Sequence, residues 1–170
     1  MKEKLPKLVK IKKNHPDAKI PAYAKRGDAG MDLTAIGKDV QDKYIEYDTG
    51  LSMEIPVGYV GLLFPRSSIS NYDLTLSNSV GVVDSGYRGN IKFRFKQTSD
   101  LTYYIGDRIG QIIIIPHPHI QFVEVDELSD SERGSGGYGH TGIKWWIQNA
   151  IDFFVFSKIE KTVNVLKIVI

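Results

Sequence analysis

The stretch from residue 78 to residue 95 constrains the fold more than any other part of the chain. Residues 91–96 alternate strictly between apolar and polar side chains, with an isoleucine and two phenylalanines on one face, as in a half-buried β-strand. Residues 80–83 are apolar, and residues 84–89 have the composition of a turn, with glycine at two positions. We therefore predict a β-hairpin. Its tip presents a carboxylate, an aromatic ring and a guanidinium, from Asp84, Tyr87 and Arg88.

Short segments with strand-like patterns follow one another along the rest of the chain, with turns between them and almost no helical periodicity. Many short strands without helices are typical of an all-β sandwich or jelly roll. The isoleucines at 112–115 predict a fully buried strand, and the serines after Arg66 predict the start of a short helix. The predicted strands fall within residues 8–12, 28–35, 51–55, 59–64, 112–115 and 120–125.

The composition is that of one ordinary globular domain. The chain has 170 residues, of which 42% are hydrophobic and 25% are charged, and this suffices for a single core. The net charge of +2 is too small to indicate nucleic acid as a partner. Without cysteine there are no disulfides and no thiolate metal ligands. No apolar run follows the first residues, so we expect a cytoplasmic protein, or a nuclear or viral one, that is not secreted.

A second informative segment is residues 129–142, which contain five glycines. Such a segment does not pack as a strand, so it is either a lid that stays mobile until a ligand orders it or a disordered linker. Arg133, His140 and Thr141 beside the glycines suit a backbone that wraps phosphates. The spacing Gly134-x-Gly136-x-x-Gly139 matches the dinucleotide fingerprint formally, but no strand precedes it and no helix follows it in the sequence pattern. A Rossmann fold is therefore not predicted.

Arg66 with the two serines after it forms a second candidate phosphate cradle, because guanidinium, hydroxyl groups and a helix N-terminus all bind phosphate oxygens. Asp84 is either a turn former or a general base acting on water. The chain contains neither a Walker A sequence nor Gly-x-Ser-x-Gly. We interpret His117-Pro118-His119 as a surface loop, because further metal ligands are lacking nearby in the sequence. Together with the glycine-rich lid, these parts predict hydrolysis of a phosphorylated small molecule.

Five short motifs resemble those of the trimeric-type deoxyuridine triphosphatases (dUTPases), in the order in which that family has them. They occupy residues 29–33, 65–68, 81–89, 106–111 and 133–142, and the match spans roughly residues 7–142. The resemblance implies a jelly-roll or β-clip barrel that forms a homotrimer, with active sites shared between chains. It also implies hydrolysis of dUTP to dUMP and pyrophosphate, which supplies dUMP and keeps uracil out of DNA.

The same resemblance assigns roles to individual residues. Asp84 would hold and deprotonate the water that attacks the α-phosphate, and Tyr87 would pack on the deoxyribose and exclude a 2′-hydroxyl. Asn78 and the backbone around Val83 would bind the uracil edge. Tyr138 would stack on uracil from the lid. The remaining substrate contacts would come from Arg66, Ser67, Ser68, Gln111, Arg133, Gly139, His140 and Thr141.

Mg²⁺ is the cofactor that the resemblance implies. It would be held mainly by the phosphates and water, so no dedicated protein cage is expected. Asp32, which would order the region around Arg66, is a candidate to contact the metal through water.

The chain departs from the family pattern in three places. Ser68 replaces a usual glycine and would either crowd a phosphate contact or add a hydroxyl, and His140 stands where serine is common. Residues 143–170 form an apolar tail beyond the β domain (1–128) and the lid (129–142). The tail has a helical period at its start, and its apolar runs are too short for a membrane span. It would dock on the trimer or a partner, lie at a membrane interface, or be an extension without a role.

Three other functions compete with dUTP hydrolysis. A dCTP deaminase, which has a related fold, would need its catalytic glutamate where this chain has Arg94, and a cation cannot serve as that acid or base. A non-catalytic, nucleotide-binding regulatory trimer would keep the pocket but would not need Asp84. A structural jelly roll of capsid or fibre type would not need the lid.

Overall fold

The computed structural model describes residues 7–138 of the chain. The chain divides after Gln121 into two units, and the first unit contains every strand of the described residues. The second unit, from Phe122 onward, is described by itself below. The predictions for Gly139, His140, Thr141 and the tail at 143–170 lie outside the described residues.

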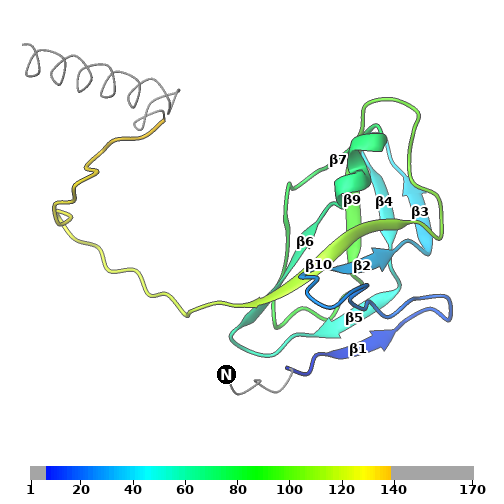
Figure 1. Cartoon of the computed structure of the whole chain (residues 1–170), viewed down its shortest axis with the longest axis horizontal. Coiled ribbons are helices and arrows are strands. Elements are labelled where there is room, and N and C mark those ends of the chain that lie inside the picture. Colours follow the sequence, from blue (N-terminus) through cyan, green and yellow to red (C-terminus); the bar gives the residue numbers. More distant parts are fainter. Residues whose placement is uncertain (1–6, 139–170) are drawn as a thin grey trace, which may run out of the picture. The chain divides into compact units, whose positions relative to one another are not determined.

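Short antiparallel strands, β1 to β10, form three sheets in the first unit (Figure 1). We call the two four-stranded sheets the β10 sheet and the β9 sheet, after their longest strands. The β10 sheet has the order β2 (Met31–Thr34), β10 (Arg108–Pro116), β6 (Tyr59–Phe64) and β8 (Gly81–Val83). The β9 sheet has the order β3 (Gly37–Val40), β4 (Ile45–Asp48), β9 (Lys92–Gln97) and β7 (Leu74–Leu76). The third sheet pairs β1 (Lys10–Lys13) with β5 (Leu51–Glu54), and the all-β prediction is confirmed.

The core follows from the alternation along the strands. Phe93 and Phe95 of β9 are buried, and Lys92 and Arg94 between and beside them point to the outer face, as predicted. Tyr47 of the neighbouring β4 packs edge-on against Phe95, with the ring centroids 5.9 Å apart. Each large apolar side chain buried in this way contributes about 1.5–3 kcal/mol to stability. The largest fully buried side chains are those of Tyr47, Tyr103, Phe93, Phe95, Leu33, Leu51, Ile55, Ile91, Ile109 and Ile112.

The strand predicted at 112–115 lies within β10, but the prediction that it is fully buried is wrong. Ile112 is buried in the core, whereas Ile115 on the opposite face of the strand is 38% exposed. The reason is that residues alternate between the two faces of a strand. The inner face of the β10 sheet meets the core, and the outer face keeps an apolar surface.

The strand predicted at 120–125 is not formed either. Ile120 is 60% exposed in the first unit, and Phe122 at the start of the second unit is 94% exposed. An apolar segment becomes a strand only where a neighbour supplies hydrogen-bonding partners. Within the described residues no strand pairs with this segment.

The predicted β-hairpin at 78–95 is wrong in its pairing, although both of its legs are strands. β8 pairs with β6 in the β10 sheet, and β9 pairs with β4 and β7 in the β9 sheet. Residues 84–91 therefore cross from one sheet to the other, and we call them the crossover loop. The alternation of apolar and polar residues identifies a strand but does not identify its partner. Several strands, here β4, β6 and β7, have edges with free backbone hydrogen-bonding groups, and the alternation does not choose among them.

The helix predicted after Arg66 is a 3-10 helix over Ser67–Asn71, preceded by Arg66 in an extended conformation. A helix of five residues has little macrodipole, so any phosphate bound there depends on side chains rather than on the helix N-terminus. Within residues 7–138, no helix is long and apolar enough to cross a membrane.

Candidate active site

Because β8 and β9 belong to different sheets, a cavity of about 450 Å³ lies between them. We call it the first cavity. Asn78, Tyr87 and residues of both legs line it. The last hydrogen bond between β7 and β9 runs from the N–H of Ser77 to the carbonyl oxygen of Arg94, at 2.9 Å. The backbone N–H and C=O groups of successive strand residues point alternately to the two neighbouring strands. Arg94 faces β7, so Lys92, two residues earlier, faces the same side. Because β7 has ended there, the backbone groups of Lys92 are directed into the cavity. A planar ligand can therefore pair with a strand edge there.

Asn78 is held at the cavity wall by a sharp turn. Ser79 has a φ of 59°, which is unusual for a residue other than glycine. The N–H of Val80 donates to the carbonyl oxygen of Asn78 at 2.5 Å and closes the turn. Strained backbone of this kind persists where the surroundings enforce it, and it is concentrated at binding sites.

Tyr87 lies on the crossover loop and is 46% exposed. Its hydroxyl group donates to the backbone carbonyl oxygen of Asn90 at 3.0 Å. The ring packs directly over Gly89, where any Cβ atom would overlap the phenol. Glycine is therefore required at position 89 if the ring is to keep this place.

Asp84 follows β8 at the tip of the crossover loop, and its side chain is exposed. Its backbone carbonyl oxygen accepts from the N–H of Tyr87 at 3.0 Å, which closes a turn. The guanidinium of Arg88 donates to the carbonyl oxygens of Ser85 at 2.6 Å and Tyr87 at 2.8 Å. Arg88 therefore stabilises the tip, and the Asp84 carboxylate faces solvent beside it.

A second cavity, of about 390 Å³, lies over the other predicted motifs. Asp32 organises its charges: one carboxylate oxygen accepts from Arg66 Nε at 2.8 Å and the other from Arg108 Nη1 at 2.9 Å. Asp28, Ser67 and Gln111 complete its polar lining. The two carboxylates that line the cavity balance the two guanidiniums, so what suits a phosphate chain here is the pair of oriented guanidinium groups rather than an excess of positive charge.

Gln111 reaches this cavity because Gly30 makes room for it. A Cβ atom at position 30 would overlap the Gln111 side-chain oxygen. The Gln111 amide donates to the carbonyl oxygen of Pro65 at 3.1 Å, which fixes its direction. The first, second and fourth motifs thus meet at one place.

Ser68, the departure from the family pattern, does not lie in the lining of the second cavity. Its hydroxyl oxygen accepts from Arg66 Nη1 at 3.3 Å. The serine therefore adds a weak support for Arg66, in addition to the one from Asp32.

Arg108 is the residue of this site that sequence reasoning missed. It lies inside the fourth motif, and β10 pairs with β2 so that Arg108 stands opposite Thr34, close to Asp32 on the same strand. Its side chain is 56% exposed and can turn toward a ligand. The signal in the sequence was the arginine of Gly106-Asp107-Arg108, but its partner became visible only with the pairing of β10 and β2.

The two cavities share no lining residue. Val83 pairs with Gly61 near the start of β6, so Asp84 lies at that end, whereas Arg66 follows the other end. A strand rises by about 3.3 Å per residue, so Val60 and Phe64 are about 13 Å apart. Arg66 lies two residues further along the chain. One chain therefore does not bring Asp84 to the phosphate cradle.

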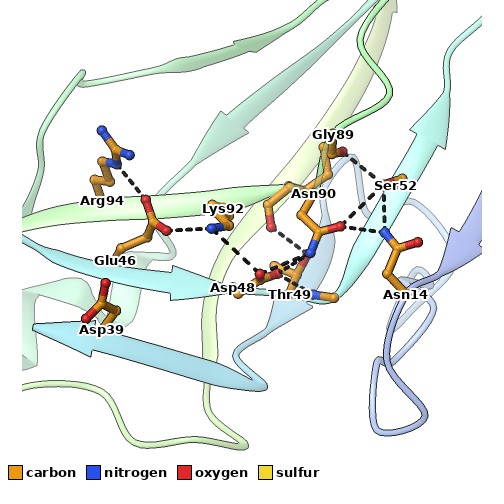
Figure 2. Close-up of polar contacts among 12 residues, drawn as sticks. Asn14, Asp39, Glu46, Asp48, Thr49, Ser52, Gly89, Asn90, Lys92 and Arg94 are labelled. Carbon is orange, nitrogen blue, oxygen red and sulfur yellow. Dashed lines mark hydrogen bonds and ion pairs between the residues drawn. The ribbon is translucent and has the colours of Figure 1, made fainter.

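A network of charges borders the first cavity on the outer face of the β9 sheet (Figure 2). Glu46 accepts from Lys92 Nζ at 2.6 Å and from Arg94 Nε at 2.7 Å. The Lys92 hydrogen bond, supported by Arg94, lowers the pKa of Glu46 below its ordinary value, while partial burial opposes this shift. Glu46 also raises the pKa of Lys92 and of Arg94. Glu46 is thus the shared ion-pair partner of Lys92 and Arg94.

The outer face of the β10 sheet carries a row of apolar side chains. Leu62 stands opposite Val82 on one side and opposite Ile113 on the other. Val82 is 63% exposed and Ile115 is 38% exposed. Exposed apolar rows of this kind are typical of surfaces that contact another protein.

In the second unit, the predicted lid residues Arg133 and Tyr138 are described. Arg133 Nε donates to the carbonyl oxygen of Gly136 at 2.9 Å, and the Tyr138 side chain is fully exposed. In residues 7–138 no group of three or more histidine, aspartate or glutamate side chains is arranged to hold a metal ion.

The sequence and the fold both resemble those of known dUTPases. The model of the dUTPase family matches residues 16–142. The deoxyuridine 5′-triphosphate nucleotidohydrolase of Thermobifida fusca (strain YX) is 43% identical over 141 residues, which are 79% of this chain and 78% of that protein.

Two solved structures from staphylococcal phages show the same fold. The dUTPase of Staphylococcus bacteriophage 80alpha, solved with dUPNHPP, superimposes with a TM-score of 0.71 at 25% identity, covering 81% of this chain and all of that one (100%). An aspartate-to-asparagine mutant of the dUTPase from phage phi11 of S. aureus, described with a structural Mg(II) ion, has a TM-score of 0.61 at 24% identity. The match covers 71% of this chain and 98% of that one.

Proposed function

Since this chain belongs to the dUTPase family, we propose that it is a dUTP diphosphatase that hydrolyses dUTP to dUMP and pyrophosphate. The observation that carries this proposal is the pair of cavities built from the four motifs of the first unit. One offers a strand edge, an asparagine and a tyrosine, and the other offers two guanidiniums held by one carboxylate. The product dUMP would be available for biosynthesis, and removal of dUTP keeps uracil out of DNA.

In the first cavity, we assign uracil to the open edge of β9 and to Asn78, with the backbone of Val83 on the opposite leg. Pairing with backbone N–H and C=O groups suits the fixed donor and acceptor pattern of uracil. Tyr87 would pack on the deoxyribose and leave no space for a 2′-hydroxyl. Asp84, exposed on the neighbouring tip, would hold a water molecule, take its proton and direct it at the α-phosphate.

In the second cavity, we assign the phosphate chain to Ser67, Gln111 and the arginine pair Arg66 and Arg108. Asp32 keeps both guanidiniums in place, so their charges are oriented before the substrate arrives. Arg108 is a new member of this set.

A complete site then needs more than one chain, because Asp84 and Arg66 follow opposite ends of β6. We infer that the first cavity of one subunit faces the second cavity of another, in a homotrimer with the jelly-roll arrangement that the family resemblance implies. The apolar row of Leu62, Val82 and Ile113 supports this inference, because contact between subunits would cover it.

Mg²⁺ is the proposed cofactor. The described residues fit a metal carried by the substrate rather than by a protein cage: both oxygens of Asp32 already accept hydrogen bonds from arginines, and the cavity is lined for phosphate. When bound, the ion would neutralise charge on the phosphate oxygens. A contact of Asp32 with the ion through water remains a prediction.

Arg133, Tyr138, Gly139, His140 and Thr141 are proposed to close over the bound nucleotide. The glycine content of the segment supports such a movement, because glycine lets the backbone approach phosphates closely. A chain ended at Ser131 is therefore expected to keep its fold and lose most of its activity.

The proposal is tested with Asp84→Asn, with Mg²⁺ present and with dUTP, dCTP, dTTP and UTP as substrates. The amide keeps the shape of the side chain but does not accept the proton of water, so pyrophosphate release from dUTP should fall by about 10²–10⁴-fold while dUTP binding persists. Asp17→Asn, an exposed carboxylate outside both cavities, is the matched control. Turnover of dUTP by Asp84→Asn at the wild-type rate, or ammonia release from dCTP by the wild type, would contradict it.

A further inference from the structure

The crossover loop has a free tip and a fixed base. At its base, four side chains from three separate stretches of the chain form a polar cluster that we call the Asn90 network: Asn14, Asp48, Ser52 and Asn90 (Figure 2). None of these residues has a role in the proposed reaction.

The contacts of the network converge on Asn90. Its amide nitrogen donates to Asp48 Oδ2 at 3.0 Å and to Oδ1 at 3.3 Å, and its side-chain oxygen accepts from Asn14 Nδ2 at 2.5 Å. The Asn14 amide also donates to Ser52 Oγ at 2.8 Å. Both ends of the Asn90 side chain are therefore engaged, and its orientation is determined.

The same network holds the backbone of the loop. Ser52 is only 8% exposed, and its hydroxyl group donates to the carbonyl oxygen of Gly89 at 3.0 Å. Two residues further, the N–H of Ile91 donates to the carbonyl oxygen of Leu51 at 2.8 Å, and Thr49 Oγ1 donates to the carbonyl oxygen of Ile91 at 2.7 Å. Gly89 and Ile91 are thus fixed to β5 and to the turn that precedes it, and Asn90 is fixed to the end of β4 and to Asn14.

Tyr87 depends on the two residues that the network fixes. Its ring packs on Gly89, and its hydroxyl group donates to the carbonyl oxygen of Asn90 at 3.0 Å. The remainder of the ring is open to solvent, with Tyr87 46% exposed. Any shift of Gly89 or Asn90 would therefore move the ring.

We propose that the Asn90 network is a positioning device for Tyr87, and that it sets how strongly the enzyme rejects ribonucleotides. The inference rests on the proposed role of Tyr87 in sugar discrimination. Exclusion of one hydroxyl group requires a ring held in place, because a ring that can yield makes room for the extra oxygen. Asn90 and Ser52 are proposed as positioning residues that act through the tyrosine, and Asn90 also lines the first cavity beside it.

The test is the ratio of kcat/KM for dUTP to kcat/KM for UTP, with Mg²⁺ present, in the full-length protein. Asn90→Ala should lower this ratio by about 2- to 10-fold, the range that corresponds to one hydrogen bond. Ser52→Ala loses the bond to Gly89 and the one from Asn14 but keeps the bonds between Asn90 and Asp48, so it should lower the ratio less. Lys10→Gln breaks the exposed pair with Glu54 on the neighbouring β1 and β5, and as a control it should leave the ratio unchanged.

A double-mutant cycle separates positioning from general loosening. Tyr87→Phe removes the hydroxyl group that bonds to Asn90, so Asn90→Ala should change the ratio much less in the Tyr87→Phe background than in the wild type. Additive effects, or equal losses of activity on dUTP and UTP with an unchanged ratio, would overturn the inference. If Asn90→Ala does not fold, the same cycle with Ser52→Ala decides.

Failure of the inference is distinguishable from failure of the proposed role of Tyr87. If Tyr87→Ala leaves the ratio unchanged, the role of the tyrosine is wrong and the inference falls with it. If Tyr87→Ala lowers the ratio but Asn90→Ala and Ser52→Ala do not, only the inference is wrong.

Discussion

The first cavity presents a framework of backbone and an aromatic ring, whereas the second presents charged side chains that are paired with one another. In the first, a strand edge and a tyrosine are positioned by neutral hydrogen bonds and close packing, as between Tyr87 and Gly89. In the second, Asp32 positions two guanidiniums by ion pairs. The difference matches what each is proposed to bind. A flat base with fixed donors and acceptors needs a rigid edge, and a flexible polyanion needs charge.

The largest expected effect tests whether the two cavities of one site come from different chains. Asp84→Asn should lower dUTP turnover by about 10²–10⁴-fold, and Arg66→Gln, which removes an electrostatic donor, should lower it by about 10²–10³-fold. If the two variants are unfolded and refolded together in equal amounts, about one quarter of the sites should receive an intact residue from each of the two chains that form them. Turnover by the mixture is compared with that of the variants refolded separately. Absence of recovery would mean that one chain supplies both residues.

The next effect sharpens the assignment of the second cavity. Arg108→Gln removes one guanidinium from Asp32, and loss of a charge-assisted hydrogen bond should lower kcat/KM for dUTP by about 10- to 100-fold. Binding of dUMP, which has a single phosphate, should change much less. Lys12→Gln on the exposed face of β1 is the charge-matched control. Equal losses for dUTP and dUMP would show that Arg108 does not act on the phosphate chain.

A smaller effect concerns packing rather than charge. In Gly30→Ala the new methyl group overlaps the end of the Gln111 side chain, which would have to turn away and give up its hydrogen bond to Pro65. We expect weaker dUTP binding, measured by calorimetry with a non-hydrolysable analogue. Gly37→Ala is the matched control, because its Cβ atom would lie 3.5 Å from the Cβ of Asp48, an ordinary contact. An equal loss of affinity in both variants would contradict the role given to Gly30.

The smallest effect belongs to the charges beside the first cavity. The hydrogen bond from Lys92, with that from Arg94, holds the pKa of Glu46 below its ordinary value of 4.5. The stabilisation is therefore present above that value and is lost as the pH falls through the lowered pKa. Because Lys92 and Arg94 are 42% and 57% exposed, it should amount to about 1 kcal/mol or less.

The variant Glu46→Gln should remove this part of the pH dependence. Its free energy of unfolding, measured in urea between about pH 3 and pH 7, should fall less steeply on the acid side than that of the wild type. Identical pH profiles would mean that Glu46 gains nothing from its partners.

Much of this site was accessible from local sequence. The alternation of residues 91–96 identified a strand and its buried phenylalanines, because side-chain direction follows from position along the chain. The motifs also placed Arg66, Ser67 and Gln111 together, and the structure brings all three to the second cavity. Arg108 escaped notice because its partner Asp32 is 76 positions away in the sequence.

What the sequence by itself determined is the chemistry at each position and the place of most strands, among them β5, β6, β9 and β10, but not β3, β4 or β7. Only the tertiary structure decided that β8 and β9 belong to different sheets, that a cavity opens between them, and that Asp84 lies far along β6 from Arg66. The physical reason is that alternation fixes the face of a strand, whereas its partner is chosen by competition among all available edges for backbone hydrogen bonds. The same competition placed the end of β4 and the turn after it beside the base of the crossover loop, where Asp48 bonds to Asn90 and Thr49 bonds to Ile91.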